Sequence, residues 1–349
     1  MKKTFLSCIL SLTLLLTGLS TTACSRAPEK FSAHSFDYFD TVTTITGYAE
    51  SREAFDEVAN AVLSQLEEYH CLFTIYYRYE GMENLCTVNE LVDGQHRTVT
   101  VDRRIVDMLL YARDMHDRTN GRVNIAMGSV LSIWHDYRTE GMNDPSAAKL
   151  PPAEMLEAAA AHTDIGNMVI DEAACTVTLT DPAMTLDVGA IAKGYAVEMV
   201  ARSLEEKGIS GYVLNVGGNV RTVGGKTDGT GWVVGIENPR EEGEDYLDYL
   251  SLSGQSLVTS GSYQRFYLVD GKSYHHIIHP DTRMPAEGYL SVSVVTSSSA
   301  DGDALSTALF CMTVEEGMAL VASMPETEAS WVLSDGTRYT SDGWSAYVS

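Results

Sequence analysis

The sequence predicts an α+β fold in which strands and helices share one large domain. Segments of alternating, β-branched residues predict strands, and segments with apolar residues every three or four positions predict helices. The two kinds follow one another without the regular period of a βαβ protein, and no repeat is evident. With 349 residues, of which 44% are hydrophobic, the chain has enough apolar material for a sizeable core.

The first half of the chain contains one predicted strand and two predicted helices. Residues 41–48 are rich in Thr, Val and Ile in an alternating order, as expected of a half-buried strand. Residues 53–69 carry apolar side chains at helical spacing from Phe55 to Leu66, and residues 105–116 show the same pattern. Each helix is therefore expected to pack one stripe on a sheet.

The second half is expected to be rich in strands. These are predicted at residues 212–216, 232–236 and 290–296, with a hairpin of residues 265–269 and 272–278 turning at Asp270-Gly271. Thr313 and Glu316 have the spacing of a capping box, so a helix should begin there and end before Pro325. A last strand is expected at residues 331–333, before a turn at residues 335–336.

The N-terminus resembles the signal of a bacterial lipoprotein. The chain begins Met-Lys-Lys, and residues 5–16 form an apolar run that is short for a membrane span. A small residue directly precedes Cys24, as in a lipobox. We expect residues 1–23 to be a lipoprotein signal peptide, residues 24–35 a tether lipidated on Cys24, and residues 36–349 the folded domain. The protein would then be extracytoplasmic and anchored to the bacterial cell membrane; a plain cleaved signal with an incidental cysteine is the alternative.

Charge and cysteine content exclude several classes of function. The chain has 24 Lys and Arg against 48 Asp and Glu, a net charge of −24, which opposes binding to nucleic acid or to an anionic lipid surface. Cys71, Cys86, Cys175 and Cys311 form no CxxC pair, which argues against zinc ribbons and dithiol redox motifs. A disulfide between Cys71 and Cys86 and free thiols are both open.

The segment from Asp187 to Val197 is the first with a pattern suited to ligand binding. A helix that begins at Asp187, with Gly189 allowing close approach of the backbone and Lys193 in the first turns, would present its N-terminus to an anion. The alternative is an Asp that only caps the helix and a Lys on a solvated face. Farther on, the paired glycines at positions 217–218 favour a tight turn between strands.

Two later segments bring acid–base and metal-binding groups. His275 and His276 are adjacent on a predicted strand, so they point to opposite faces; with no HExxH motif, one inward His acting as a general base is favoured over a zinc site. Asp303 and Thr307 lie one helical turn apart if a helix starts near Asp301, and both offer hard oxygen donors of the kind that Mg²⁺ prefers. A capping Asp and a Thr bonded to its own helix are the alternative.

Taken in order, these motifs resemble the ApbE family of FAD:protein FMN transferases over roughly residues 36–325. The family pattern consists of D-x-x-A-x-x-K-G-Y-A, N-x-G-G, T-S-G-x-Y-x-R-F, H-H-I-I-x-P and D-A-L-x-T-A, met here by residues 187–196, 215–218, 259–266, 275–280 and 303–308. An N-x-x-x-G-x-x-x-x-x-W region is met by Asn124, Gly128 and Trp134, and an upstream Tyr region is represented by Tyr76. The order of the motifs carries the resemblance, because each alone is weak.

The resemblance implies a T-fold-like domain that takes FAD and Mg²⁺, attaches FMN to a Thr or Ser of a target flavoprotein, and releases AMP. It implies the following roles: metal ligation by Asp303, Thr307 and the carbonyl of Ala190; FAD binding by Asp187, Lys193, Ile277, Tyr76, Asn124, Ile125 and Ala126; and catalysis by Lys193 and His276. Two other functions use the same groups. Water could attack FAD to give FMN and AMP, or the protein could be a non-catalytic FAD-binding lipoprotein.

Overall fold

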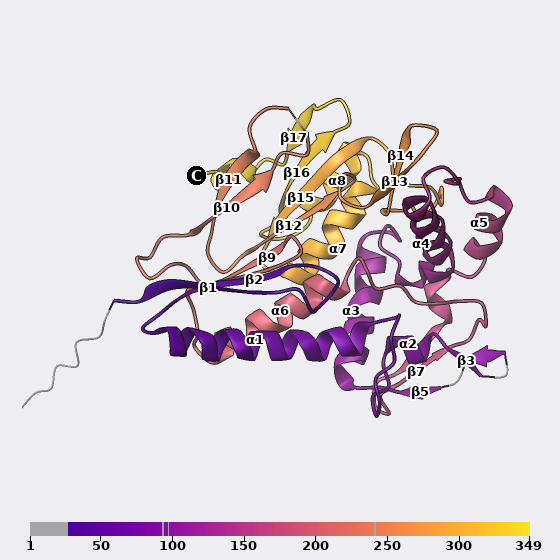
Figure 1. Ribbon diagram of the computed structural model, residues 1–349, viewed down its shortest axis with the longest axis horizontal. Helices are drawn as coiled ribbons and strands as arrows, with labels where there is room; N and C mark the ends of the chain where they lie inside the picture. Colours follow the sequence, from indigo (N-terminus) through magenta and orange to yellow (C-terminus); the bar gives the residue numbers. More distant parts are fainter. Residues whose placement is uncertain (1–26, 93, 97, 241) are drawn as a thin grey trace, which may run out of the picture.

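The computed structural model describes residues 27–349 except 93, 97 and 241. Its centre is one antiparallel sheet of eight strands (Figure 1). In order across the sheet, the strands are β1 (Glu29–Ser35), β2 (Thr43–Ala49), β8 (Tyr212–Val216), β9 (Asn219–Val223), β12 (Ser256–Gly261), β15 (Tyr289–Thr296), β16 (Glu328–Leu333) and β17 (Arg338–Thr340). The N-terminal strands thus form one edge of the sheet and the C-terminal strands the other, so the sheet joins both ends of the described chain in one structural unit.

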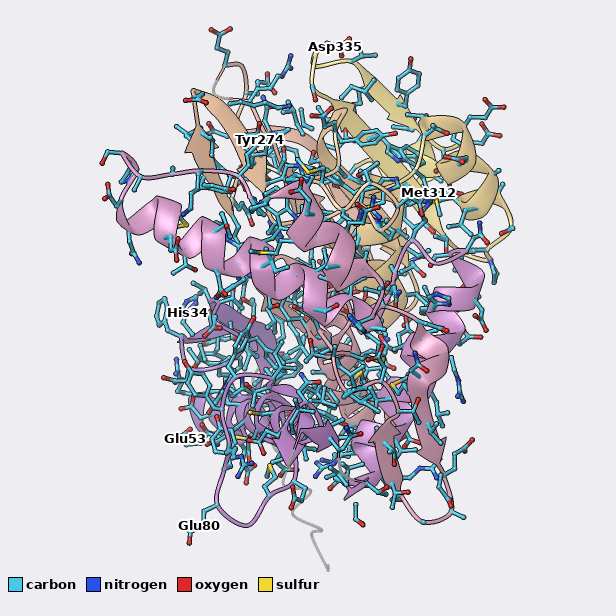
Figure 2. The ribbon with its side chains drawn as sticks, turned by 90° about the vertical axis from the view of Figure 1, so that its right-hand side faces the viewer. His34, Glu53, Glu80, Tyr274, Met312 and Asp335 are labelled. Carbon is cyan, nitrogen blue, oxygen red and sulfur yellow. The ribbon has the colours of Figure 1, made fainter. Side chains whose placement is uncertain are left out.

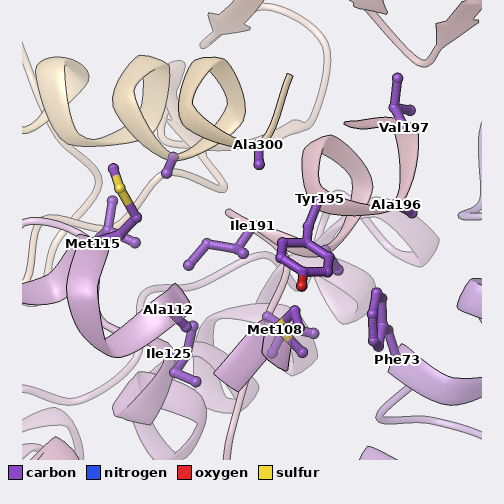
Figure 3. Packing of buried hydrophobic residues seen from close by; sticks show 14 of the residues in the cluster. Phe73, Met108, Ala112, Met115, Ile125, Ile191, Tyr195, Ala196, Val197 and Ala300 are labelled. Atoms are coloured by element: carbon purple, nitrogen blue, oxygen red, sulfur yellow. The ribbon is translucent and has the colours of Figure 1, made fainter. Parts of the chain in front are cut away.

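Helices cover one face of this sheet. These are α1 (Arg52–Phe73), α6 (Ala192–Glu206) and α7 (Ser299–Phe310), and α3 (Arg103–Arg118) contacts α6 and α7 through Tyr111. Apolar side chains of the helices and the sheet form the largest core cluster, in which Tyr195 of α6 lies against Phe73 of α1 (Figure 3). This packing sets the N-termini of α6 and α7 beside each other.

The other face of the sheet carries a two-stranded ribbon. Strands β10 (Trp232–Glu237) and β11 (Tyr246–Leu252) form a two-stranded sheet of their own. Ile236 and Leu250 of this ribbon pack in a second core cluster with Leu257 of β12. At the start of the ribbon, the Trp232 ring lies 5.4 Å from that of Tyr48 on β2, centroid to centroid. The ribbon is therefore held to the sheet by contacts of its apolar face.

The remaining elements surround one end of the sheet. The hairpin of β13 (Phe266–Val269) and β14 (Lys272–His275) packs on α4 (Gly128–Asn143) in a third apolar cluster. In Figure 2, Tyr274 of β14 lies in the same half of the molecule as Met312, just after α7, with His34 and Glu53 in the other half.

The remaining elements are short. The helices are α2 (Leu85–Val88), α5 (Ala153–Ala160), α8 (Val314–Ala322) and the single turns η1 (Ile125–Met127), η2 (Ile165–Asn167) and η3 (Trp344–Ala346). The strands form the pair β3 (Leu91–Val92) and β4 (Gln95–His96) and the small sheet of β5 (Val99–Thr100), β7 (Thr176–Leu179) and β6 (Met168–Asp171).

The predicted α+β class is confirmed, and so are the predicted helices and strands, with small shifts at their ends. The capping box at Thr313 and Glu316 is present at the start of α8. The paired glycines, with φ of 56° and 91°, form the turn between β8 and β9, where only glycine adopts such angles at little cost. Cys71, Cys86, Cys175 and Cys311 are all free thiols.

Two boundaries differ from the predictions. Residues 29–35, expected in the tether, form β1, which pairs with β2 along its whole length and packs Phe31 on Phe55 of α1. Side chains of β1 alternate between solvent and the core, and an edge strand needs only one buried face. A largely polar segment can therefore form it. Asp187 does not begin a helix: α6 starts at Ala192, and the Asp187 carboxylate instead accepts the N–H of Gly189 within the preceding loop, at 2.8 Å.

The expected signal peptide and Cys24 lie outside the described residues. Within the part of the chain that the structure describes, no helix combines the length and the apolar character that a membrane crossing requires.

A glycine in the first turn of α6 allows the two site helices to approach. A Cβ atom on Gly194 would lie 2.4 Å from both the Cβ of Asp303 and the carbonyl oxygen of Ser299. We expect Gly194→Ala to force α6 and α7 apart and to cost about 1–3 kcal/mol of unfolding free energy, measured by urea denaturation. Gly189→Ala is the control, because a Cβ there meets only the side-chain oxygen of Asp187, at 3.1 Å. Equal unfolding midpoints for Gly194→Ala and the wild type would contradict this account.

Candidate active site

Most of the residues predicted for the site line one cavity of about 270 Å³. It lies where the N-termini of α6 and α7 meet the ends of β9 and β12, with α4 and the segment after β14 closing the opposite side. The predicted residues that line it are Tyr76, Asn124, Asp187, Ala190, Lys193, His276, Ile277, Asp303 and Thr307. The tertiary structure thus brings together segments more than 200 residues apart in the sequence, from Tyr76 to Asp303 and Thr307.

Lys193 and Asp303 form the centre of the cavity wall. The Lys193 ammonium lies 3.2 Å from one carboxylate oxygen of Asp303, and the other oxygen accepts the backbone N–H of Gly194 at 2.8 Å. Asp303 therefore satisfies an otherwise free N–H in the first turn of α6 from a neighbouring helix, in the manner of a cap. Helix α7 begins two residues before Asp301 and so places Thr307 one turn after Asp303, as predicted.

The two adjacent histidines face opposite ways, as predicted. His275 is buried, with Nε2 2.7 Å from the carbonyl oxygen of Ala286 and Nδ1 accepting the N–H of Ile277 at 3.2 Å. These partners require Nε2 to carry the proton, so His275 holds the segment after β14 in place. His276 lines the cavity, and its buried Nδ1 has no hydrogen-bond partner among the described residues.

The surroundings of His276 keep its ring neutral. Burial, and then the nearby guanidinium groups of Arg265 and Arg138, lower the pKa of His276 to about 3. Burial and these positive charges outweigh the hydrogen bond to the Arg265 backbone that favours the charged form, so the neutral ring is the populated form at neutral pH. A general base starts from the neutral form, which the cavity holds; the same positive charges weaken the ring's affinity for a proton, and a bound anion beside Arg138 and Arg265 would restore part of it.

Asp187 and Asn124 hold the loop that borders the cavity. The N–H of Asp187 donates to the carbonyl of Ile125 at 2.7 Å, and burial raises the pKa of the Asp187 carboxyl, although the N–H of Gly189 opposes this. The Asn124 side chain accepts the N–H of Ala126 and donates to the carbonyl of Thr163, both at 2.9 Å. The amide of Asn124 is therefore engaged in holding η1.

The predicted FAD contacts of Ile125 and Ala126 are not supported for their side chains. Both are almost completely buried in the main core, and neither lines the cavity. The segment forms η1, a single 3₁₀ turn whose residues are all buried. The motif letters alone do not indicate this burial. What Ile125 contributes is the carbonyl that anchors Asp187. Tyr76 lies at the cavity's edge with an exposed ring, 5.9 Å from that of His135 between centroids.

Three arginines of the cavity were missed by sequence reasoning, and of these Arg122 is paired with Asp281. Arg138 of α4 is half-buried, and burial together with the positive charge of Arg265 lowers its pKa. Arg265 precedes β13 and forms no ion pair within the described residues. Arg265 stands inside the T-S-G-x-Y-x-R-F motif, which signals it, whereas nothing in the sequence around Arg138 does. Unpaired like charges this close together indicate a site for an anion.

The cavity has too few metal-binding side chains to hold a cation by protein ligands alone. Among the residues that the structure describes, no group of three or more His, Cys, Asp and Glu side chains is placed to hold a metal ion. Two carboxylates line the cavity, those of Asp187 and Asp303, and the other candidate hard oxygen donors predicted for a metal are the Thr307 hydroxyl and the backbone at Ala190. Any cation here must therefore complete its coordination with water and substrate oxygens.

Comparison with known proteins agrees with this arrangement. The family model described as "ApbE family" matches residues 39–331, which include every residue of the cavity. The chain belongs to the ApbE family. A relative named FAD:protein FMN transferase, from Klebsiella pneumoniae (strain 342), is 33% identical over 270 residues, which are 75% of this chain and 80% of the relative. One of the same name from Treponema pallidum is 32% identical over 247 residues, 68% of this chain and 67% of the relative.

Solved ApbE structures share the fold of this ApbE-family chain. The ApbE protein of Thermotoga maritima superposes with a TM-score of 0.78 at 26% identity, covering 92% of this chain and all of the other. The flavin transferase ApbE of Vibrio cholerae gives a TM-score of 0.76 at 24% identity over the same shares. The one-domain α+β prediction is thus also confirmed by comparison with ApbE structures.

Proposed function

We propose that this protein is an Mg²⁺-dependent enzyme that transfers the FMN part of FAD to a Thr or Ser hydroxyl of a target flavoprotein and releases AMP. The relatives described above carry the name of this activity. The observation that carries the proposal is the meeting of Lys193, Asp303 and a neutral His276 in one cavity. Together these groups can bind a pyrophosphate and deprotonate an alcohol.

The charge of the cavity suits the pyrophosphate of FAD. Arg122, Arg138, Lys193 and Arg265 line it, and since Arg122 is paired with Asp281 and Lys193 with Asp303, Arg138 and Arg265 remain in excess over Asp187, whereas the whole chain carries a net charge of −24. A local excess of cations in an acidic protein attracts an anionic substrate to this place and away from the rest of the surface. Arginine also matches phosphate oxygens with paired N–H donors.

The oxygen donors of the cavity fit Mg²⁺. We propose that the Asp303 carboxylate, the Thr307 hydroxyl and the Ala190 carbonyl hold the ion, because Mg²⁺ prefers a small number of hard oxygen ligands and keeps places for water and phosphate. When bound, Mg²⁺ would neutralise negative charge on the pyrophosphate.

The protein's own groups account for the proton and the leaving group. The acceptor oxygen forms a bond to the phosphorus on the FMN side, and the bond from that phosphorus to the bridging oxygen breaks, so that AMP leaves with the bridging oxygen. His276 takes the proton of the attacking hydroxyl on its ring. Lys193 lies near enough to Asp303 to place its positive charge beside the reacting phosphates, which favours the build-up of charge in the transition state.

The function is tested by incubating the protein with FAD, Mg²⁺ and a candidate flavoprotein domain and then measuring intact mass and free nucleotides. Transfer predicts one AMP for each acceptor that gains FMN less one water. FMN and AMP in equal amounts without a modified acceptor would instead indicate an FAD pyrophosphatase. FAD that is bound but left intact would indicate a non-catalytic binding lipoprotein.

We also propose that the protein is a lipoprotein held at the outer side of the bacterial cell membrane through Cys24. The support is the short apolar run that ends at Cys24. Cys24→Ala should then move the protein from the membrane fraction to the soluble fraction, measured by fractionation and blotting, because no lipid can be attached. Equal membrane association of the variant, or a mature N-terminus mapped elsewhere, would rule out this anchor.

A further inference from the structure

A second, larger hollow adjoins the catalytic cavity. It is a groove of about 940 Å³ between the β10–β11 ribbon and the sheet face that the helices leave uncovered, and we call it the ribbon groove. One wall is the whole of β10, and the other includes Thr44, Thr46 and Asn215. The groove and the cavity share Thr41, Gly217, Thr259 and Gln264, so they are continuous. A molecule that fills the groove therefore reaches the reaction site at its end.

The β10 wall of the groove is a backbone edge. All six residues of Trp232–Glu237 line the groove, although successive side chains of a strand point to opposite faces. If one face of β10 formed the wall, only alternate residues would line it. Because all six do, the groove runs along the edge of the strand, where the backbone is exposed. Gly235, which has no side chain, lines the groove as well.

Among the residues that the structure describes, the outward backbone groups of this edge have no partner strand. On β11, the Ser251 N–H donates to Tyr347 at 2.8 Å, and the Tyr249 carbonyl accepts the Ser349 N–H at 2.9 Å, so both residues turn their backbone groups away from β10. Their partners on β10 are Val233 and Gly235, which in an antiparallel ladder must turn away from β11 in the same way. The N–H and C=O groups of Val233 and Gly235 are thus free to pair with a further strand.

The charge and polarity of the groove separate it from the FAD site. The groove carries the carboxylates of Glu237, Glu244 and Asp245, which repel a pyrophosphate, against Lys30 and Arg240. Its sheet wall offers uncharged hydroxyl and amide groups, and the exposed Val233 and Tyr246 add apolar surface. Such a surface suits a polypeptide, while the arginines of the neighbouring cavity suit the dinucleotide.

We propose that the ribbon groove binds the acceptor segment of the target flavoprotein as an extended strand paired with the free edge of β10. The segment's Thr or Ser hydroxyl would then lie at the junction of groove and cavity, where Gly217 and Thr259 belong to both. This inference rests on the proposed transfer of FMN. Pairing through the main chain selects an extended, accessible segment and lets side chains vary, and a filled groove places an alcohol where water would otherwise attack FAD.

The test compares Val233→Pro with Val233→Ala. Proline removes the outward N–H of residue 233 without removing a bond to β11, whereas alanine keeps that N–H and loses the same exposed side chain. The probe is a library of blocked peptides of roughly nine residues with a single Thr near one end or the other, so that the remaining residues can span the six of β10 while the Thr reaches the cavity. With FAD and Mg²⁺, Val233→Pro should attach flavin to peptides about tenfold more slowly than Val233→Ala, with equal FAD affinity. Equal rates would overturn the proposal.

A binding measurement on the wild type separates docking from chemistry. The same peptides, without FAD, should slow hydrogen exchange at the amides of Val233 and Gly235, and no protection there would overturn the docking proposal. If the peptides protect these amides but none of them gains flavin when FAD and Mg²⁺ are added, docking is supported and the transfer function is refuted for such acceptors. Protection that appears without peptide and grows with protein concentration would mean that a second copy of the chain occupies the edge, which also overturns the proposal.

Discussion

Replacing His276 with alanine should lower the rate of FMN transfer by about 10²–10⁴ while FAD affinity changes little. The imidazole lines the cavity with a neutral ring whose buried Nδ1 has no partner among the described residues, so its removal deletes a base whose Nδ1 holds no other group in place. Single-turnover transfer and FAD titration measure the two effects separately. His276→Ala that transfers at the wild-type rate, or that fails only because FAD no longer binds, would remove the base role.

The control for this variant needs a histidine outside the cavity. His275 is unsuitable, because both its ring nitrogens hold backbone groups, and its loss would disturb the segment that carries His276. His116, on the last turn of α3, is the better choice, and His116→Ala should transfer normally.

The pH dependence gives an independent measure of the same role. A group with a lowered pKa is charged only below that pKa, so the neutral base is lost as pH falls toward about 3. The acid side of the kcat/KM profile for FAD should therefore show no loss from His276 near its ordinary value of about 6.5. A loss centred near that value, absent in His276→Ala, would contradict the environment described here.

Replacing Asp303 with alanine should abolish measurable transfer and weaken Mg²⁺ binding, since the change removes the only carboxylate among the proposed metal ligands. A metal ion supplies several kcal/mol of charge stabilisation in such reactions, so we expect a loss of about 10³-fold or more. Thr307→Val should act in the same direction but less severely, because a hydroxyl contributes no charge. Calorimetric titration with Mg²⁺ and the single-turnover rate measure these effects. Full activity of Asp303→Ala at saturating Mg²⁺ would refute the assignment.

Asp303→Asn distinguishes the metal role from the structural one. Asp303 accepts the N–H of Gly194 at the start of α6, and losing this cap in Asp303→Ala should cost about 0.5–2 kcal/mol of unfolding free energy. The amide oxygen of asparagine can accept the same N–H but brings no charge. Asp303→Asn should therefore unfold at nearly the wild-type urea concentration and still fail to bind Mg²⁺ and to transfer FMN.

The local elements were predictable because they depend on local patterns. The capping box at Thr313, the strand at residues 212–216 and the amphipathic helix from residue 53 each follow from side-chain spacing within one segment. The prediction failed at β1, where a polar stretch becomes a strand only because β2 offers its edge. It failed again at Asp187, since a loop held by the carbonyl of Ile125 precedes the helix.

The sequence by itself determined which chemical groups this protein has and in which order its motifs stand, and that order was enough to indicate the ApbE family. Only the tertiary structure decided how those groups act. It set Asp303 against the N-terminus of α6, lowered the pKa of His276 by burying it beside Arg138 and Arg265, and turned Ile125 and Ala126 into the core. It also joined the ribbon groove to the cavity. The physical reason is that burial, charge proximity and free strand edges depend on contacts between segments distant in the chain, which side-chain spacing within one segment does not encode.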